Sequence, residues 1–221
     1  MTGGDATTAE TGRTPSPGFL TLPSPPHPRV HWCFTLRSGG VSRGAWGDRD
    51  GHGGLNLGTG CGDDPAAVDR NRAALAGAVG RPIRWLDQVH GTVVSDADDG
   101  APAASGHPAA DAQVATRGGA ALAILVADCL PVLLADRGGR VIGAAHAGWR
   151  GLAGGVVEMT VAAMRSRVPD ADLVAWLGPS IGPAAFEVGD EVRQAFIGVN
   201  PADRSGFRAG PRGGKWFADL P

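Results

Sequence analysis

The sequence has 221 residues, of which 43% are hydrophobic, and this is enough apolar material for one globular domain or two small ones. Its 20 basic and 22 acidic residues give a formal net charge of −2, and no run of Lys and Arg with interleaved aromatic residues offers the positive surface that nucleic acid requires. Three widely spaced Cys residues argue against a disulfide framework, so we expect a reducing, cytoplasmic environment.

The N-terminal region is predicted to be a disordered leader. Residues 1–28 are rich in Thr, Ser, Pro and Gly, and they contain no basic region followed by an apolar stretch, so no signal peptide is predicted. The apolar run at 120–127 is much shorter than the roughly 20 residues of a membrane span. We therefore expect one folded domain over residues 29–221 and no membrane partner.

The remaining segments alternate between strand and helix patterns. Helices are indicated by capping and apolar periodicity, and strands by apolar runs that end in Gly or Pro turns. Predicted strands are 30–36, 83–91, 121–136, 139–147 and 172–177, and predicted helices are 63–80, 152–168 and 190–198. Because there is no regular strand–helix–strand repeat, we predict an α+β fold with a mixed sheet in a single domain.

Three of these segments bring a zinc-type ligand to the end of an apolar stretch, beside small residues. They are QVHG with His90, ADCLP with Cys129 and AAHAGWRG with His146. Their spacings are far longer than the loops of a zinc finger, so the three side chains can meet only through the tertiary fold. Two imidazoles and one thiolate leave a fourth position of zinc open, which suits a catalytic site rather than a structural one.

Asp128 directly precedes the predicted cysteine ligand. It is a candidate either to orient His90 or His146 by a hydrogen bond or to carry a proton. Neighbouring strand residues face opposite sides, so Asp128 and Cys129 can both face a metal only if the strand ends there. Pro131 favours such an end.

Seven segments together resemble one known family: TLRSGGVS, LNLG, GDDPAAVDRNRAAL, LDQVHG, ADCLPVLLAD, GAAHAGWRGLAGGVV and LGPSIGP…FEVGDEV. They match, in this order, the pattern of the multicopper polyphenol oxidoreductase or laccase-domain family. That family is also described as a peptidoglycan editing factor and purine nucleoside phosphorylase family. The resemblance runs from about residue 30 to residue 219, and ADCLP together with AHAGWRG is its most specific part.

The resemblance implies a mixed-sheet α/β/β/α sandwich and a single zinc ion carried by His90, Cys129 and His146. It also implies phosphorolysis of adenosine, inosine, guanosine and methylthioadenosine, with hydrolytic deamination of adenosine as a second activity. The implied partners are a small nucleoside and phosphate, and the oligomeric state is left open. Two differences stand out: Ala184 and Ala185 occupy a place where the family usually has Cys, and relatives continue for several tens of residues, so we expect a short C-terminus.

Five further residues are candidates to contact substrate under this resemblance. The guanidinium of Arg150 can hold phosphate bidentately, the alternative being a surface ion pair at a helix start, and Arg37 in a glycine-rich loop is a second candidate. Asn56 and Gln88 can bind sugar hydroxyls or the purine edge, or else stabilise turns. Trp149 can stack on a base or pack in the core.

Three other functions compete with a zinc phosphorylase. Copper, implied by the family's older name, is less expected than zinc, because a multicopper oxidase needs on the order of ten His, largely as His-x-His pairs, and this chain has six His and no such pair. A Cys-His hydrolase that edits a peptidoglycan precursor would use Cys129 as its nucleophile. A binding protein without turnover is the third alternative.

Overall fold

The structure is a computed structural model that describes residues 16–20, 22–99 and 106–220. The described residues form two compact units, and the domain expected from residue 29 onward contributes to both. The first unit comprises residues up to 23 together with 33–82, and the second comprises 24–32 together with 83–220. No helix in the described part of the chain combines the length and apolar character needed to cross a bilayer.

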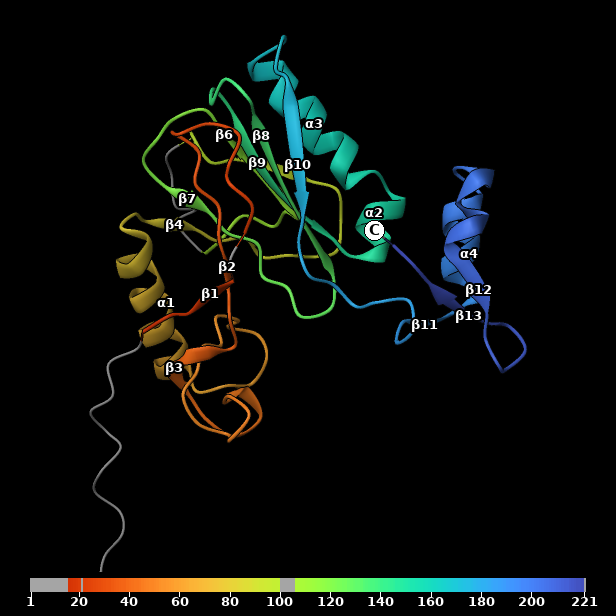
Figure 1. The fold of residues 1–221 in the computed structure, drawn as a ribbon, viewed down its shortest axis with the longest axis horizontal. Helices are drawn as coiled ribbons and strands as arrows, with labels where there is room; N and C mark the ends of the chain where they lie inside the picture. The colour runs from red at the N-terminus through yellow and green to blue at the C-terminus, as the bar shows by residue number, and fades with distance from the viewer. Residues whose placement is uncertain (1–15, 21, 100–105, 221) are drawn as a thin grey trace, which may run out of the picture. The chain divides into compact units, whose positions relative to one another are not determined.

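The first unit is built on one helix, α1 (Pro65–Val79), which packs beside strand β3 (Ser38–Ser42) (Figure 1). The predicted helix is confirmed: Asp64 caps its first turn by accepting a hydrogen bond from the N–H of Ala66, and Gly80 follows its last residue. The other elements of this unit are short, namely β1 (Phe19–Leu20), β2 (Phe34–Thr35) and the 3₁₀ helix η1 (Gly44–Trp46).

The second unit contains the main sheet, which has five strands in the order β10-β8-β9-β6-β5. Only the β5–β6 pair is parallel, so the sheet is mixed, as predicted. A small parallel sheet pairs β4 with β7. The strands are β4 (Ile83–Arg84), β5 (Val94–Asp96), β6 (Ala112–Ala115), β7 (Ala121–Leu122), β8 (Leu130–Asp136), β9 (Ile142–Ala147) and β10 (Leu173–Leu177).

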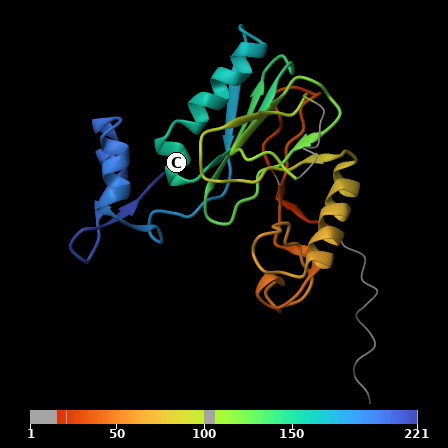
Figure 2. The same ribbon diagram turned by 180° about the vertical axis from the view of Figure 1, so that it is seen from behind.

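Helix α3 (Val156–Arg167) lies along this sheet and forms the core with it (Figures 1 and 2). Val132 and Ala145 of the sheet and Val156 and Met164 of the helix are all inaccessible to solvent or nearly so. In the turn that joins β8 to β9, the guanidinium of Arg140 donates to the buried carboxylate of Asp136. This hydrogen bond holds the pKa of Asp136 well below its usual range.

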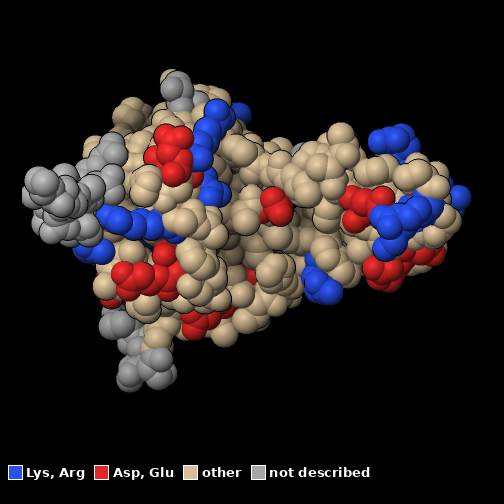
Figure 3. All heavy atoms as spheres, turned by 90° about the horizontal axis from the view of Figure 1, so that it is seen from below, with Lys and Arg blue, Asp and Glu red and all other residues tan. Residues whose placement is uncertain are grey.

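The C-terminal part of the second unit is a three-stranded antiparallel sheet, β11-β13-β12, covered by helix α4. Val192 and Phe196 of α4 pack with Val188 and Ala218 of the sheet. The elements are β11 (Glu187–Gly189), α4 (Asp190–Ile197), the 3₁₀ helix η2 (Pro201–Gly206), β12 (Phe207–Ala209) and β13 (Lys215–Ala218). On the face shown in Figure 3, basic and acidic side chains are intermixed.

Several predicted boundaries were wrong. Residues 16–20 do not belong to a disordered leader, because β1 pairs with β2, while residues 1–15 and 21 of that leader lie outside the described residues. The strand expected over 30–36 is reduced to Phe34–Thr35, and the strand expected over 83–91 ends at Arg84.

Two predicted elements are each divided in two. The run 121–136 contains β7 and β8 with a bend between them, so the strand does not end near Pro131 but begins at Leu130. The helix expected over 152–168 is α2 (Trp149–Ala153) followed by α3. The break falls at Gly155, whose φ of 89° is a left-handed conformation that glycine adopts without steric cost.

Candidate metal centre

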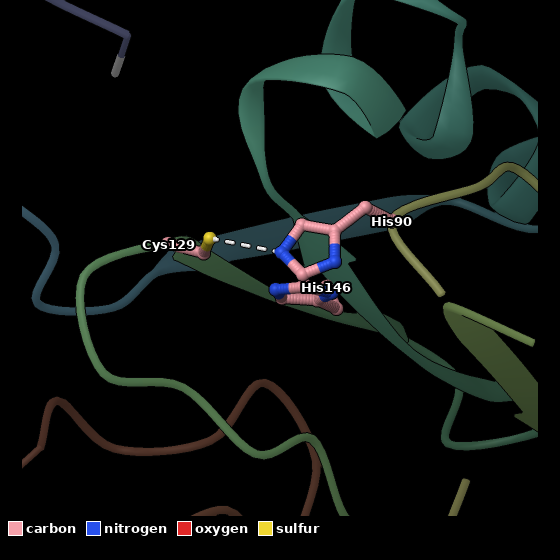
Figure 4. Close-up of side chains that lie close together, drawn as sticks. All are labelled: His90, Cys129 and His146. Carbon is pink, nitrogen blue, oxygen red and sulfur yellow. Dashed lines mark hydrogen bonds between the residues drawn. The ribbon is translucent and has the colours of Figure 1, made fainter. Parts of the chain in front are cut away.

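The three predicted ligand side chains lie together at one end of the main sheet (Figure 4). One nitrogen of His90, one nitrogen of His146 and the sulfur of Cys129 all lie within 4.8 Å of one another. Cys129 Sγ is 3.9 Å from His90 Nε2, and the two imidazole rings meet edge to face with centroids 4.7 Å apart. This is the one group of three or more possible metal ligands among the described residues.

The β8–β9 hairpin supplies two of these ligands. His146 is in β9, buried, and pairs with Pro131 of β8, while Leu130 pairs with Ala147. If this register continues by one residue, it sets Cys129, which precedes β8, against Gly148, which follows β9. A hairpin buried on both faces therefore places the imidazole of His146 and the thiol of Cys129 on adjacent backbones.

The third ligand, His90, lies in a tight turn between β4 and β5 rather than on a strand. It is exposed, and its φ of 60° is the one left-handed value among the non-glycine residues that the structure describes. Asp111 Oδ1 accepts the N–H of His90 at 2.9 Å, and Oδ2 accepts those of Val89 and Gly91 at 3.2 and 2.6 Å. The turn is thus wrapped around one buried carboxylate.

The same carboxylate also reaches the second histidine. His146 Nδ1 lies 2.8 Å from Asp111 Oδ1, and Asp111 is completely buried. When Nδ1 carries the proton and donates it to Asp111, the lone pair of Nε2 is free to face the group in Figure 4. Burial alone would raise the pKa of Asp111, but the hydrogen bonds from His146 and the turn lower it overall.

Gly148 is required by the close approach of the ligands. A Cβ on this residue would lie 2.9 Å from His90 Cδ2 and 3.1 Å from Cys129 Sγ. Its φ of −65° and ψ of 158° are open to every residue, so the need for glycine here is steric and not conformational. Any side chain at this position would enter the space between the ligands.

The electrostatics of the centre favour a bound cation. Burial, together with the negative charges of Asp128 and Asp111, raises the pKa of the Cys129 thiol. Burial, together with the neighbouring His90, lowers the pKa of His146, although Asp111 opposes this shift. A positive ion would stabilise the thiolate and would replace the proton that the His146 imidazole is reluctant to carry.

The donor set fits zinc better than a hard cation. Imidazole nitrogen and thiolate sulfur are the ligands that zinc prefers, whereas calcium and magnesium require oxygen. Tetrahedral zinc, with bonds of about 2.0–2.3 Å, separates a nitrogen from a sulfur ligand by about 3.5 Å. The 3.9 Å between Cys129 Sγ and His90 Nε2 is close to that separation.

A pocket of about 120 Å³ opens onto His90 and Cys129, two of the three side chains. It is also lined by Asp128, Trp149, Arg150, Ile181, Phe186 and Leu220. Two of the three possible metal ligands thus line a largely apolar cavity.

Trp149 and Arg150 lie at the beginning of α2 and line this pocket as a pair. The guanidinium carbon of Arg150 is 4.3 Å from the centre of the Trp149 ring, a cation–π contact. Arg150 is exposed, and it forms no ion pair with any residue in the described ranges, which disfavours the surface ion pair considered above. Its remaining N–H groups are available to an anion.

Asp128 lines the pocket but does not orient either histidine. Its side chain is exposed, and the hydrogen bond predicted for it at His146 is made by Asp111 instead. The backbone carbonyl of Asp128 accepts the N–H of Ile181 at 2.9 Å, which ties the bend before β8 to the opposite wall of the pocket.

The other side chains that were predicted to contact substrate form hydrogen bonds within the protein instead. Arg37 donates to the carbonyls of Ala45 and Gly47 at 2.6 Å, and it belongs, like Asn56, to the first unit. Asn56 donates to Asp63 at 2.9 Å and to the carbonyl of Gly58 at 3.2 Å. In the second unit, the amide of Gln88 both donates to and accepts from the backbone of Leu125 at 2.7 Å.

Sequence reasoning missed Asp111 and the apolar walls Ile181, Phe186 and Leu220. Asp111 stands directly before the buried strand β6, and a carboxylate at such a place needs strong partners. That was the one signal available. Phe186 lies within the segment FEVGDEV that carried part of the family resemblance, but nothing in its spacing marks it as a pocket residue.

Comparison with known proteins identifies the family of this chain. Residues 31–221 match the family model described as multi-copper polyphenol oxidoreductase laccase. The chain belongs to this family. It is 46% identical over 202 residues to a purine nucleoside phosphorylase of Pseudomonas aeruginosa, and these residues cover 91% of this chain and 78% of that protein. It is 44% identical over 204 residues to the purine nucleoside phosphorylase YfiH of Escherichia coli, and these residues cover 91% of this chain and 79% of that protein.

Two solved structures share the fold. Protein NMB0706 of Neisseria meningitidis superposes with a TM-score of 0.81 at 48% identity, covering 91% of this chain and 78% of that one. YlmD of Geobacillus stearothermophilus superposes with a TM-score of 0.79 at 30% identity, covering 92% and 77%. The α+β fold with a mixed sheet is thereby confirmed.

Proposed function

We propose that this protein is a zinc-dependent purine nucleoside phosphorylase that takes adenosine, inosine, guanosine and methylthioadenosine and that also deaminates adenosine. The observation that carries the proposal is the His90–Cys129–His146 group, two members of which line an apolar pocket that Arg150 also lines. Relatives at 44–46% identity that bear the name purine nucleoside phosphorylase supply the reaction.

The pocket offers a separate surface for each part of the reaction. Trp149, Ile181 and Phe186 form apolar walls that suit a flat purine. Arg150, exposed at the mouth, can hold phosphate through two parallel hydrogen bonds. Both reactants would thereby be held in one pocket, which lowers the entropic part of the barrier.

Phosphorolysis forms a bond between a phosphate oxygen and C1′ and breaks the bond between C1′ and N9. The electron pair of the broken bond goes to the purine, which takes up a proton. Asp128 lines the pocket, and its carboxyl group is placed to exchange that proton with the leaving base. In the deamination, water adds at C6 of adenosine and ammonia leaves.

Zinc held by His90, Cys129 and His146 would supply a Lewis acid with one open position. The residues of the chain hold, orient and surround it: Asp111 fixes the tautomer of His146, and Gly148 leaves room for the ligands. The walls of the pocket exclude water from the reacting atoms.

A chromatographic assay tests the activity. The zinc-loaded protein is incubated with inosine, with and without phosphate, and we expect hypoxanthine and ribose 1-phosphate only when phosphate is present. Adenosine should give adenine with phosphate and inosine without it. Absence of both free base and deaminated product from all substrates would refute the proposal.

Matched cysteine variants test the metal. Cys129→Ala should lose bound zinc and turnover together, whereas Cys33→Ala, which changes an exposed free cysteine of the first unit, should keep both. Metal content is measured by mass spectrometry of the purified proteins. Equal zinc content in the two variants would contradict the ligand assignment.

Alkylation of Cys129 and activity of the copper-loaded protein test the two competing enzymes. A Cys-His hydrolase would use a free Cys129 thiolate, which iodoacetamide would alkylate, while a zinc-bound thiolate would be protected until a chelator removes the metal. A copper oxidase would need several centres, and the described residues contain one group of two His and one Cys. Oxidation of a phenol by copper-loaded protein would support that alternative.

A further inference from the structure

Asp111 is the most heavily hydrogen-bonded carboxylate around the metal centre. It is completely buried, and its two oxygens accept four hydrogen bonds, three from consecutive backbone N–H groups and one from an imidazole. Its backbone carbonyl also accepts the N–H of His146 at 2.7 Å. One residue therefore contacts both the main chain and the side chain of the buried ligand.

For His146, the contact selects a tautomer. An ionised carboxylate accepts hydrogen bonds and donates none, so Nδ1 must carry the proton that lies between them. The lone pair is then on Nε2, the atom turned toward Cys129 and His90 in Figure 4. Without this acceptor, either tautomer would be open to the ring, and only the tautomer with its lone pair on Nε2 can bind a metal that also contacts Cys129 and His90.

For His90, the contact maintains an unfavourable backbone conformation. Non-glycine residues rarely adopt a φ of 60°, and His90 does so in an exposed turn that lies between the short strands β4 and β5. The three N–H groups of Val89, His90 and Gly91 converge on the carboxylate and offset this cost. The turn thereby presents the imidazole of His90 to the other two ligands.

We infer that Asp111 is a positioning residue that sets two metal ligands at once, by fixing the tautomer of His146 and by holding the turn that presents His90. The inference rests on the metal centre proposed above but not on the identity of the substrate. Asp128, the other carboxylate of the site, is exposed and makes neither contact, so it does not share this role. Removing the charge of Asp111 should loosen both histidines together.

Asp111→Asn is the informative variant, because an amide of the same shape cannot replace the carboxylate. Its single oxygen can accept either from His146 and His90 or from Val89 and Gly91, and in each case the NH₂ group faces another donor. We expect the affinity for zinc to fall about 10–100-fold, the usual range for a changed partner of a metal ligand. Competition with a coloured chelator measures it.

Asp98→Asn is the matched control. Asp98 is half-buried in the same unit, and it likewise accepts backbone N–H groups, those of Thr116 at 2.7 Å and Arg117 at 3.1 Å, and neither donor is a histidine. Its pKa is lowered in the same direction, with burial opposed by these hydrogen bonds. We expect Asp98→Asn to bind zinc as the unchanged protein does.

Two spectroscopic measurements separate positioning from general loss of structure. Long-range nitrogen NMR of the metal-free, unchanged protein should show His146 with its proton on Nδ1, and in Asp111→Asn the Nε2-protonated form should appear. Cobalt-loaded protein should show the intense visible bands of a tetrahedral thiolate site, and these should weaken in Asp111→Asn. Nucleoside turnover enters neither measurement, so failure of the phosphorylase proposal would leave both intact.

Three results would overturn the inference. The first is zinc affinity in Asp111→Asn within twofold of the unchanged protein. The second is an equal loss in Asp98→Asn. The third is an Nε2 proton on His146 in the unchanged, metal-free protein, and this measurement decides the question even where Asp111→Asn does not fold.

Discussion

Gly148→Ala changes the metal centre by a single methyl group, with little effect expected elsewhere. The added Cβ would lie 2.9 Å from His90 Cδ2, whereas two carbon atoms are comfortable at about 3.5 Å or more, so one of them must move by about 0.6 Å. Metal sites tolerate errors of about 0.2 Å in ligand position. The displaced His90 should therefore weaken zinc binding by about 10–100-fold, or about 1.4–2.8 kcal/mol.

The same substitution should leave the metal-free fold intact. The backbone of Gly148 is extended, a conformation that alanine adopts freely, and replacing glycine at such a position adds about 0.4–1 kcal/mol of stability through the unfolded chain. His90 is exposed and can move aside when no metal holds it. We expect the free energy of unfolding without zinc to change by no more than about 1 kcal/mol.

Chelator competition and urea unfolding of metal-free protein measure the two quantities. The control is Gly119→Ala, an exposed glycine of the same unit whose Cβ would meet no atom within 4 Å. The reasoning is refuted if Gly148→Ala binds zinc within twofold of the unchanged protein. It is also refuted if the variant loses more than about 2 kcal/mol of stability without metal, because the clash would then lie in the fold and not among the ligands.

Three other variants test the core, the acid response and the pocket. Met164→Ala should cost about 2–5 kcal/mol in urea unfolding because Met164 is fully buried, while Met159→Ala on the exposed side of the same helix should cost much less. Asp136 has a lowered folded-state pKa, so its stabilising effect is present above about pH 4 and is lost as the pH falls further. Asp136→Asn should therefore flatten the fall in unfolding free energy between pH 5 and pH 3, and parallel curves would contradict this. Trp149→Phe should raise KM for inosine more than it lowers kcat, whereas Trp216→Phe, beneath a similar arginine at 4.2 Å, should change neither.

Helices α1 and α4 and the ligand set were predictable from the sequence, for different physical reasons. Helix α1 has capping residues at both ends, an aspartate before its first residue and a glycine after its last, so its bounds follow from local chemistry. His90, Cys129 and His146 were found because small residues surround each of them and because their segments resemble a family. That they meet was a prediction about tertiary structure, and the structure brings them within 4.8 Å.

Strand boundaries and the role of Asp111 were not predictable, because both depend on partners distant in sequence. The run 121–136 is mostly apolar, and the pairing of β7 with β4 and of β8 with β9 decides where it bends. Asp111 is one aspartate among many, with no spacing that marks it. Its importance comes from burial and from four donors that arrive from residues 89–91 and from His146.

The metal centre combines one rigid part with one adjustable part. His146 is 3% exposed and Cys129 is half-buried, and both are tied to a hairpin whose other residues form the core. His90 is exposed and depends on the hydrogen bonds to Asp111 for its conformation. Because the turn that bears His90 also borders the pocket, the position of this imidazole controls both the completeness of the ligand set and the shape of the wall that a substrate meets. A change in Asp111 or Gly148 would therefore alter the pocket through His90, although neither residue is among those that line it.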